Sequence, residues 1–410
     1  MRSPGEYSLY IHVPFCRSFC DYCDFYSVLG PPAGAAAGAP VGEGGDMVER
    51  YVDTLAADAR GLFEEFPPRR IPTVYIGGGT PSVLGAGAMG RLLEALGELL
   101  PPEEGREWTV EANPESLDKE FLRICRAAGV NRLSLGIQTF SPPVREKLHR
   151  GGGMEQLRHA LALAAEQFPG AFSVDLLTGL PGQSRAMLQR DIGQALGFKP
   201  AHVSLYALSL EEGTPLWARA AELPSGDRAD RLWIHGRDML EGSGYAQYEV
   251  SNFCLPGNES CHNLRYWAMK NWLALGPSGS GTLIDDREGA GLRLSWPADL
   301  DAWLVRGPDW RTRLREEKLD RLTLVKESLL MGFRCTHWPD ASLFRRRFGV
   351  SPEEAIPGTL ARWRSRGLVR AKDAADAPET GPALTAEGLL FLNPFLVDAF
   401  EELEHSAVFP

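Results

Sequence analysis

Six short apolar runs, each followed by a segment of helical length, restrict the possible folds of this 410-residue chain more than any other feature. Such runs are typical of buried strands, and the segments between them carry Leu and Ala at helical spacing. The runs are Tyr7–Val13, Thr73–Ile76, Glu107–Ala112, Arg132–Ile137, Phe172–Leu177 and His202–Leu208. The helical segments are Met47–Phe66, Gly90–Leu100, Phe121–Ala128, Pro142–Leu148, Met154–Phe168 and Met187–Leu196. Repeated strand-then-helix units predict an α/β fold with a parallel sheet, most simply a partial (β/α)6 barrel.

The pattern changes near residue 230, and we expect three parts, at residues 1–230, 231–317 and 318–410. A helix is predicted at Arg231–Glu241. In the last part, helices are predicted at Leu322–Phe333, Ala341–Phe348 and Pro357–Arg366, a polar wing at Leu368–Thr385 and a final helix at Ala386–Phe400. This small C-terminal α+β region resembles a winged-helix module. Residues 30–45 are rich in Gly, Ala and Pro, which predicts a mobile surface loop.

Charge and composition exclude several classes of protein. The 43 basic and 54 acidic residues give a net charge of −11, which argues against a general nucleic-acid binder. The sequence has no apolar run of the roughly 18 residues that a membrane span needs, and no signal-peptide pattern at its start. We therefore expect a cytoplasmic protein. Seven cysteines, three of them within eight residues, indicate a metal site rather than a disulfide framework.

Cys16, Cys20 and Cys23 follow the first apolar run and form a CxxxCxxC pattern. Three thiolates at this spacing can hold three irons of a [4Fe–4S] cluster. A fourth cysteine is missing at the usual short spacing, where Phe25 stands, so one iron would keep an open coordination position, as catalytic metal centres do. Zinc is the competing metal, but zinc sites usually use two paired half-sites, which this sequence lacks.

This cysteine pattern after a first strand resembles the signature of the radical S-adenosylmethionine (SAM) superfamily. The wording YIHVPFC…CDYCDFYS resembles its oxygen-independent coproporphyrinogen oxidase-like branch, and the resemblance runs from about Leu9 to Asn393. It implies a radical SAM barrel that binds a [4Fe–4S] cluster and S-adenosylmethionine. In such barrels the chemistry lies where strands end and loops begin.

The ends of the successive runs carry residues suited to a cofactor. Gly77, Gly78 and Gly79 make a turn without Cβ atoms, where backbone can approach a ligand closely. Glu111 places a carboxylate at the barrel mouth, where ribose hydroxyls are good partners. By resemblance, the cofactor contacts are Tyr10, Tyr22, Gly78, Gly79, Thr80, Glu111, Gln138, Arg150 and Asp175. Gln138, Arg150 and Asp175 match positions of a second SAM molecule in the oxidase, and the number bound here stays open.

Three members of this branch compete as models for the chain. The oxygen-independent coproporphyrinogen oxidase ends its cluster motif in Cys-x-Cys and carries a long N-terminal arm, whereas this chain has Phe25 and only nine residues before Tyr10. A HemN-like radical SAM methyltransferase would use the same barrel motifs. The HemW family of heme chaperones has the motif HNxxYW, and here residues 262–267 read HNLRYW. The sequence therefore favours a HemW-like heme chaperone and does not establish an enzymatic reaction.

The resemblance implies heme as a further ligand, with His262 as the axial ligand and the neighbouring aromatic residues as a porphyrin surface. It also implies recipient hemoproteins as partners, membrane-associated ones included, and suits a ligand-linked homodimer. One position departs from the family, because Ser280 stands where the family has a histidine. If that histidine assists heme binding, affinity or geometry here differs.

Overall fold

The computed structural model describes residues 5–30, 43–305, 310–371 and 381–406. Its main element is a 12-stranded sheet with the strand order β14-β13-β12-β11-β1-β4-β5-β6-β7-β8-β10-β9. Six central strands run parallel: β1 (Glu6–Val13), β4 (Arg70–Gly78), β5 (Glu107–Ala112), β6 (Arg132–Gln138), β7 (Phe172–Thr178) and β8 (His202–Ala207). These are the six runs predicted as strands, so the predicted α/β fold with a parallel core sheet is confirmed.

Both flanks of the sheet are additions that the apolar runs do not predict. On one side β11 (Trp272–Leu275) pairs parallel with β1, and β12 (Ser280–Asp285), β13 (Ala290–Ser295) and β14 (Arg315–Leu319) follow antiparallel. On the other side β10 (Asn252–Cys254) and β9 (Ala246–Gln247) are antiparallel to β8 and to each other. A separate two-stranded sheet joins β2 (Phe15–Cys16) to β3 (Val28–Leu29). Within the described residues the large sheet is open, as a partial barrel is.

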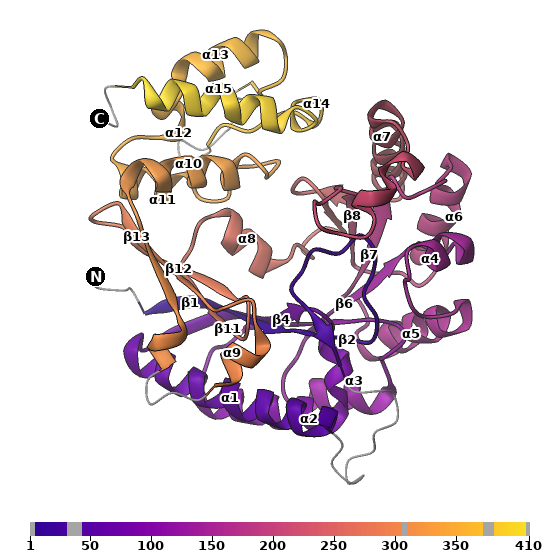
Figure 1. The fold of residues 1–410 in the computed structure, drawn as a ribbon. Coiled ribbons are helices and arrows are strands. Elements are labelled where there is room, and N and C mark those ends of the chain that lie inside the picture. The colour runs from indigo at the N-terminus through magenta and orange to yellow at the C-terminus, as the bar shows by residue number, and fades with distance from the viewer. Residues whose placement is uncertain (1–4, 31–42, 306–309, 372–380, 407–410) are drawn as a thin grey trace.

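Helices cover the outer face of the curved sheet (Figure 1). They are α1 (Glu43–Glu65), α2 (Gly85–Leu99), α3 (Lys119–Ala127), α4 (Pro142–Lys147), α5 (Met154–Gln167), α6 (Arg185–Leu196) and α7 (Gly226–Gly242), with 3₁₀ turns η1 (Pro81–Leu84) and η2 (Trp217–Glu222). Helix α8 (Cys261–Trp267) lies on the inner side of the curve (Figure 1). The expected boundary at residue 230 falls inside α7. Most of the expected loop at residues 30–45 lies outside the described residues, and α1 begins at Glu43.

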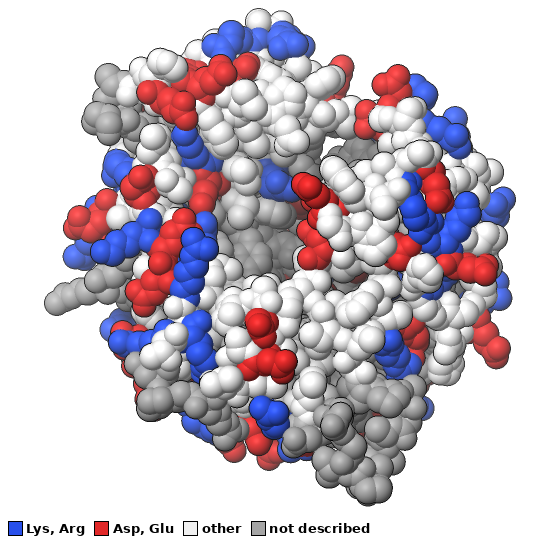
Figure 2. Space-filling model, viewed as in Figure 1, with Lys and Arg blue, Asp and Glu red and all other residues white. Residues whose placement is uncertain are grey.

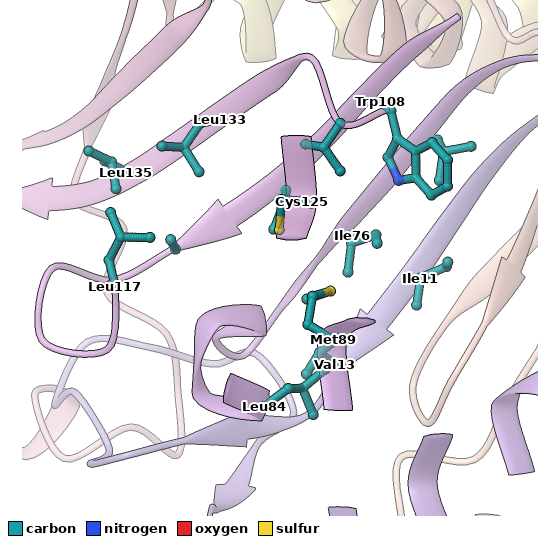
Figure 3. Packing of buried hydrophobic residues seen from close by; sticks show 14 of the residues in the cluster. Ile11, Val13, Ile76, Leu84, Met89, Trp108, Leu117, Cys125, Leu133 and Leu135 are labelled. Carbon is teal, nitrogen blue, oxygen red and sulfur yellow. The ribbon is translucent and has the colours of Figure 1, made fainter. Parts of the chain in front are cut away.

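Strand side chains alternate between an apolar outer face and a more polar inner face. Figure 3 shows Ile76 and Leu133 among the buried strand residues that Met89 of α2 and Cys125 of α3 cover. Burial of one such side chain contributes about 1.5–3 kcal/mol. On β1 and β4, the residues that alternate with the buried apolar ones include Ser8, Tyr10, Thr73 and Tyr75. Successive side chains of a strand point to opposite faces, so these residues face the interior of the barrel. The helices therefore stabilise the barrel from outside and leave its interior to polar groups.

The C-terminal part has its own hydrophobic cluster, separate from that of the barrel. Its helices are α10 (Arg321–Gly332), α11 (Ala341–Phe348), α12 (Pro352–Ala355), α13 (Pro357–Ser365), α14 (Ala386–Leu389) and α15 (Leu392–Glu404); α9 (Leu300–Leu304) and η3 (Trp310–Arg313) precede them. The predicted final helix is two helices, and α12 was not predicted. At the expected wing the structure shows one antiparallel bridge, Val369 with Leu384, while residues 372–380 lie outside the described residues. The winged-helix interpretation therefore stays a prediction.

None of the described helices is both long enough and apolar enough to cross a membrane.

Candidate functional site

A cavity of about 430 Å³ opens where the parallel strands end. Its volume suits a ligand the size of a small cofactor. Of the residues predicted to bind cluster or cofactor, it is lined by Cys16, Cys20, Tyr22, Cys23, Gly78, Gly79, Thr80, Glu111, Gln138, Arg150 and Asp175. Tyr10 and His262 are not among its lining residues. On the face shown in Figure 2 the molecule is hollowed near its centre, and basic and acidic side chains are interspersed around the hollow.

The cysteine loop is held in place by contacts at both of its ends and in its middle. Cys16 lies in β2, which pairs with β3, and the backbone N–H of Cys23 donates to the Cys20 carbonyl at 3.1 Å. Between them the buried Asp21 carboxylate accepts a hydrogen bond from Arg219 at 2.5 Å and lies 2.7 Å from Nδ1 of His149. The loop is therefore fixed by residues far away in the sequence, and sequence reasoning missed all three members of this contact.

The three thiols suit a multi-iron group better than a single metal ion. In the described part of the chain, no three His, Cys, Asp or Glu side chains converge closely enough for one ion. Three cysteines around one cavity satisfy a cubane cluster, where each thiolate binds a different iron. Burial raises the pKa of Cys23 to about 11 and raises that of Cys16 as well, so the cation of a bound metal would be needed to deprotonate them.

The glycine turn at the end of β4 packs too tightly for any other residue. A Cβ atom on Gly79 would lie 2.9 Å from the carbonyl oxygens of Val13 and Phe15, and the Gly79 N–H already donates to Val13. Gly78 has φ of +107°, and a Cβ there would lie 2.7 Å from the His12 ring. The turn thus brings bare backbone to the cavity wall beside the cysteine loop.

Two partly buried carboxyl groups, Glu111 and Asp175, face the same cavity from β5 and β7. Burial raises the pKa of Glu111 to about 7 and that of Asp175 to about 6. The hydroxyl of Tyr75 donates to Glu111 at 2.6 Å, and Ser134 donates to Asp175 at 3.2 Å. Strongly shifted carboxyl groups in a cavity are typical of functional sites. A cationic ligand would favour their ionised forms.

Gln138 and Arg150 reach the cavity from β6 and from the segment that follows α4. Gln138 has φ of +67° at the end of β6, where the register with β7 shifts, and such irregularities redirect side chains. The partly buried guanidinium of Arg150 donates to Sγ of Cys20 at 3.5 Å and to the side chain of Asn113 at 2.6 Å. Asn113 also lines the cavity and was not predicted. The sequence offered a signal for it, because Asn113 follows Glu111 at the end of β5.

Tyr10 and His262 contact Tyr75 and are not part of the cavity wall. The Tyr10 ring stacks on Tyr75 with centroids 6.3 Å apart, and its hydroxyl is 3.1 Å from Nδ1 of His12. Tyr75 in turn stacks on the His262 ring at 5.0 Å and bonds to Glu111. Tyr75 therefore links the buried histidine to the cavity, although no sequence motif marks it.

His262 is 1% exposed, at the first turn of α8. Its Nδ1 lies 2.9 Å from the Thr73 hydroxyl, its backbone N–H donates to Glu107 at 2.8 Å, and burial lowers its pKa to about 3. Its Nε2 is buried without a hydrogen-bond partner among the described residues. One ring nitrogen is thus oriented and the other left free, as in a histidine that binds a metal, but the ring is enclosed in this conformation.

Ser280 lies on β12, where its hydroxyl is 2.9 Å from that of Ser295, and it is not among the cavity residues.

Comparisons with known proteins identify the relatives of this chain. Residues 10–195 match the model of the radical SAM superfamily. The chain is 34% identical to the heme chaperone HemW of Lactococcus lactis over 351 residues, which cover 85% of this chain and 86% of that protein. It is 35% identical to the heme chaperone HemW of Escherichia coli over 274 residues, covering 67% and 69%.

Two further comparisons extend over nearly the whole chain. The radical S-adenosyl methionine domain-containing protein 1, mitochondrial, of Bos taurus is 34% identical over 426 residues, covering 98% of this chain and 90% of that protein. The solved structure of coproporphyrinogen III oxidase (HemN) from Escherichia coli superposes with a TM-score of 0.78 at 22% identity, covering 96% and 90%, which shows a shared fold. The chain therefore belongs to the radical SAM superfamily and, within it, to the family of the heme chaperone HemW.

Proposed function

We propose that this protein is a heme chaperone that holds a [4Fe–4S] cluster and S-adenosylmethionine at the barrel mouth, binds heme, and delivers it to hemoproteins. The observation that carries the first half is that three thiols, a bare glycine turn and two partly buried carboxyl groups line one cavity. The names of the HemW relatives and the HNLRYW motif support the second half.

Some residues of the cavity would bind the cluster, and others would bind S-adenosylmethionine. Cys16, Cys20 and Cys23 would each hold one iron, which leaves the fourth iron to the amino and carboxylate groups of S-adenosylmethionine. When bound, the cluster would supply the electron for cleavage of the sulfonium of S-adenosylmethionine. The turn at Gly78 and Gly79 admits the amino-acid part of the cofactor, because no side chain stands in the way. Glu111 and Asp175 offer acceptors to the ribose hydroxyls and a negative charge to the sulfonium.

Heme ligation by His262 is part of this proposal. Thr73 holds one ring nitrogen and the other is buried without a partner among the described residues, which suits an imidazole awaiting iron. Because the ring is enclosed between Tyr75 and Tyr266, heme reaches it only when α8 moves away from the sheet.

The same proposal assigns a role to each of the three expected parts of the chain. Residues 1–230 carry the cluster and cofactor, residues 231–317 carry the HNLRYW motif, and residues 318–410 form the winged-helix-like module. A reducing compartment such as the cytoplasm suits cluster-binding thiolates.

A hemin titration of the anaerobically reconstituted protein tests the heme half of the proposal. We expect a saturable Soret band at one heme per chain, shifted and weakened in His262→Ala. The Tyr266→Phe variant is the matched control, because it keeps the aromatic contact with the His262 ring. Equal Soret spectra for wild type and His262→Ala would remove His262 as the ligand, and a linear, unsaturable titration of wild type would contradict heme binding.

The same preparation, reduced and supplied with S-adenosylmethionine and coproporphyrinogen, separates the chaperone from the oxidase. The proposal expects unchanged coproporphyrinogen, whereas a decarboxylated product would identify an oxidase.

A further inference from the structure

A continuous chain of side-chain hydrogen bonds joins two of the three cysteines. Sγ of Cys16 lies 3.6 Å from the Thr80 hydroxyl, which lies 2.9 Å from the amide nitrogen of Asn113. The amide oxygen of Asn113 is 2.6 Å from Arg150, whose other terminal nitrogen is 3.5 Å from Sγ of Cys20. One asparagine thus stands at the centre of a link between the sulfur atoms of Cys16 and Cys20.

The direction of every hydrogen bond in this chain follows from the arginine. A guanidinium only donates, so the Asn113 oxygen must face Arg150 and its NH₂ group must face Thr80. The Thr80 oxygen then accepts from Asn113, and its own proton is free for Cys16. Both ends of the chain therefore present a donor to a sulfur atom, and this arrangement requires a side chain at 113 that accepts on one side and donates on the other.

The surroundings of Asn113 hold it in this orientation. Its backbone N–H donates to Ser82 at 3.2 Å, and its carbonyl accepts from the backbone N–H of Ser116 at 3.1 Å. The neighbouring strand β6 leaves room for the side chains of Asn113 and Arg150 to meet, because Gly136 has no side chain. A Cβ atom on Gly136 would lie 2.8 Å from both Arg150 and the Asn113 oxygen. The contact between Asn113 and Arg150 thus depends on a glycine at the end of β6.

Donors to cluster sulfurs affect redox behaviour directly. A reduced cluster carries one more negative charge than an oxidised one, so hydrogen bonds to its thiolates stabilise the reduced form and raise the reduction potential. We propose that Asn113 is a positioning residue that directs one donor at Cys16 and another at Cys20, and thereby raises the reduction potential of the cluster. The inference rests on the proposed cluster site, and Asn113 acts through Thr80 and Arg150.

The Asn113→Asp variant isolates the direction of the hydrogen bonds. A carboxylate keeps the shape and still accepts from Arg150, but it cannot donate to Thr80. Thr80 must then donate to residue 113, and Cys16 loses its donor. We expect a more negative midpoint potential for the cluster. At a fixed solution potential, the ratio of reduced to oxidised cluster should fall about tenfold, which corresponds to a shift of about 59 mV for one electron.

A second pair of variants separates hydrogen-bond direction from added charge. Thr80→Val removes the donor to Cys16 without adding charge, so we expect a shift in the same direction, whereas Thr80→Ser keeps the hydroxyl and should keep the wild-type potential. Asn131→Asp is the matched control, because Asn131 bridges Trp108 and Arg106 at the opposite end of β5 and β6. It should leave the potential unchanged.

The measurement is a dithionite titration of the reconstituted full-length protein, followed by the electron paramagnetic resonance signal of the reduced cluster. Negative shifts in Asn113→Asp and Thr80→Val, with Thr80→Ser and Asn131→Asp at the wild-type value, support the inference. A wild-type potential in Thr80→Val overturns it, whatever Asn113→Asp shows. If Asn113→Asp assembles no cluster, the two Thr80 variants decide. Failure of the wild type itself to assemble a cluster would instead contradict the proposed function.

Discussion

Glu111 and Asp175 are the two carboxyl groups of the cavity whose ionisation the fold alters. Both carboxyl groups are partly buried in the folded state, and this desolvation raises the pKa to about 7 for Glu111 and about 6 for Asp175. In the unfolded chain both titrate near pH 4. Between about pH 4 and pH 7 the folded state therefore binds more protons than the unfolded state, and the free energy of unfolding falls as the pH rises.

This linkage predicts how Glu111→Gln changes stability. At pH 5 the buried group is protonated in the wild type, so the neutral variant gains little from this effect, whereas at pH 8 it avoids an unfavourable buried charge. We expect the melting temperature of the ligand-free variant, relative to wild type, to rise between pH 5 and pH 8. Calorimetry across this range measures it. A difference between the two proteins that stays constant with pH would show that burial does not control Glu111.

At the scale of helices and strands, the positions of the six parallel strands could be predicted because each is a short apolar run with β-branched or aromatic residues. The positions of Gly78 and Glu111 at strand ends could be predicted from the same runs, since the carboxyl ends of parallel strands meet at one edge. Their assignment as cofactor contacts came from the resemblance to the family and stays a prediction. Asp21 with Arg219, and Asn113 with Arg150, could not be predicted, because their contacts join segments that only the folded chain brings together. The flanking strands β9 to β14 were missed because several are short or polar.

The placement of His262 shows where a motif alone misleads about geometry. HNLRYW marks the segment, but it does not reveal that α8 lies inside the curve of the sheet (Figure 1). That position follows from Glu107, whose carboxylate accepts the backbone N–H groups of Cys261 and His262 at the start of the helix. Such a cap is favourable because a carboxylate matches the positive end of a helix.

Helix α3 provides a prediction about the outer layer of the barrel. The Asp118 carboxylate accepts the backbone N–H of Phe121 at 2.8 Å and caps the first turn of the helix. Asp118→Ala should lower the free energy of unfolding by about 1 kcal/mol, whereas Asp118→Ser should retain most of it. Urea denaturation of both variants measures this difference. Equal losses in the two variants would mean that the hydroxyl of serine cannot replace the carboxylate as a cap.

At the scale of the whole molecule, the hydrophobic cluster of the C-terminal helices includes Met269 and Ile284 from the segment beside the barrel, and polar contacts reinforce this junction. Arg347 of α11 is the most buried of these links. It donates to Asp286 at 2.9 Å and to the backbone carbonyl of Met269 at 3.1 Å. Lys270 adds an ion pair with Asp340 at 2.6 Å. These contacts place the C-terminal helices next to the segment that carries the HNLRYW motif.

Removal of this link should weaken the attachment of the C-terminal helices to the segment at residues 269–286. Arg347→Leu leaves the partly exposed Asp286 and the Met269 carbonyl without their donor, and we expect a loss of about 1–3 kcal/mol in the free energy of unfolding. Calorimetry should show a broadened or split unfolding transition. Arg345→Leu is the matched control, because Arg345 pairs with Glu354 on the surface and such pairs contribute little. A single sharp transition in Arg347→Leu at the wild-type temperature would contradict this role.

The central claim is that one cavity holds the cluster and S-adenosylmethionine side by side. The electron paramagnetic resonance spectrum of the reduced cluster tests it most directly, because a molecule bound to the open iron changes that spectrum. Cys16→Ala should lose the cluster signal, and Cys125→Ala, in a buried thiol of α3, should keep it. The account predicts that S-adenosylmethionine changes the spectrum of the wild type in a saturable way. A spectrum that is identical with and without saturating S-adenosylmethionine would contradict it.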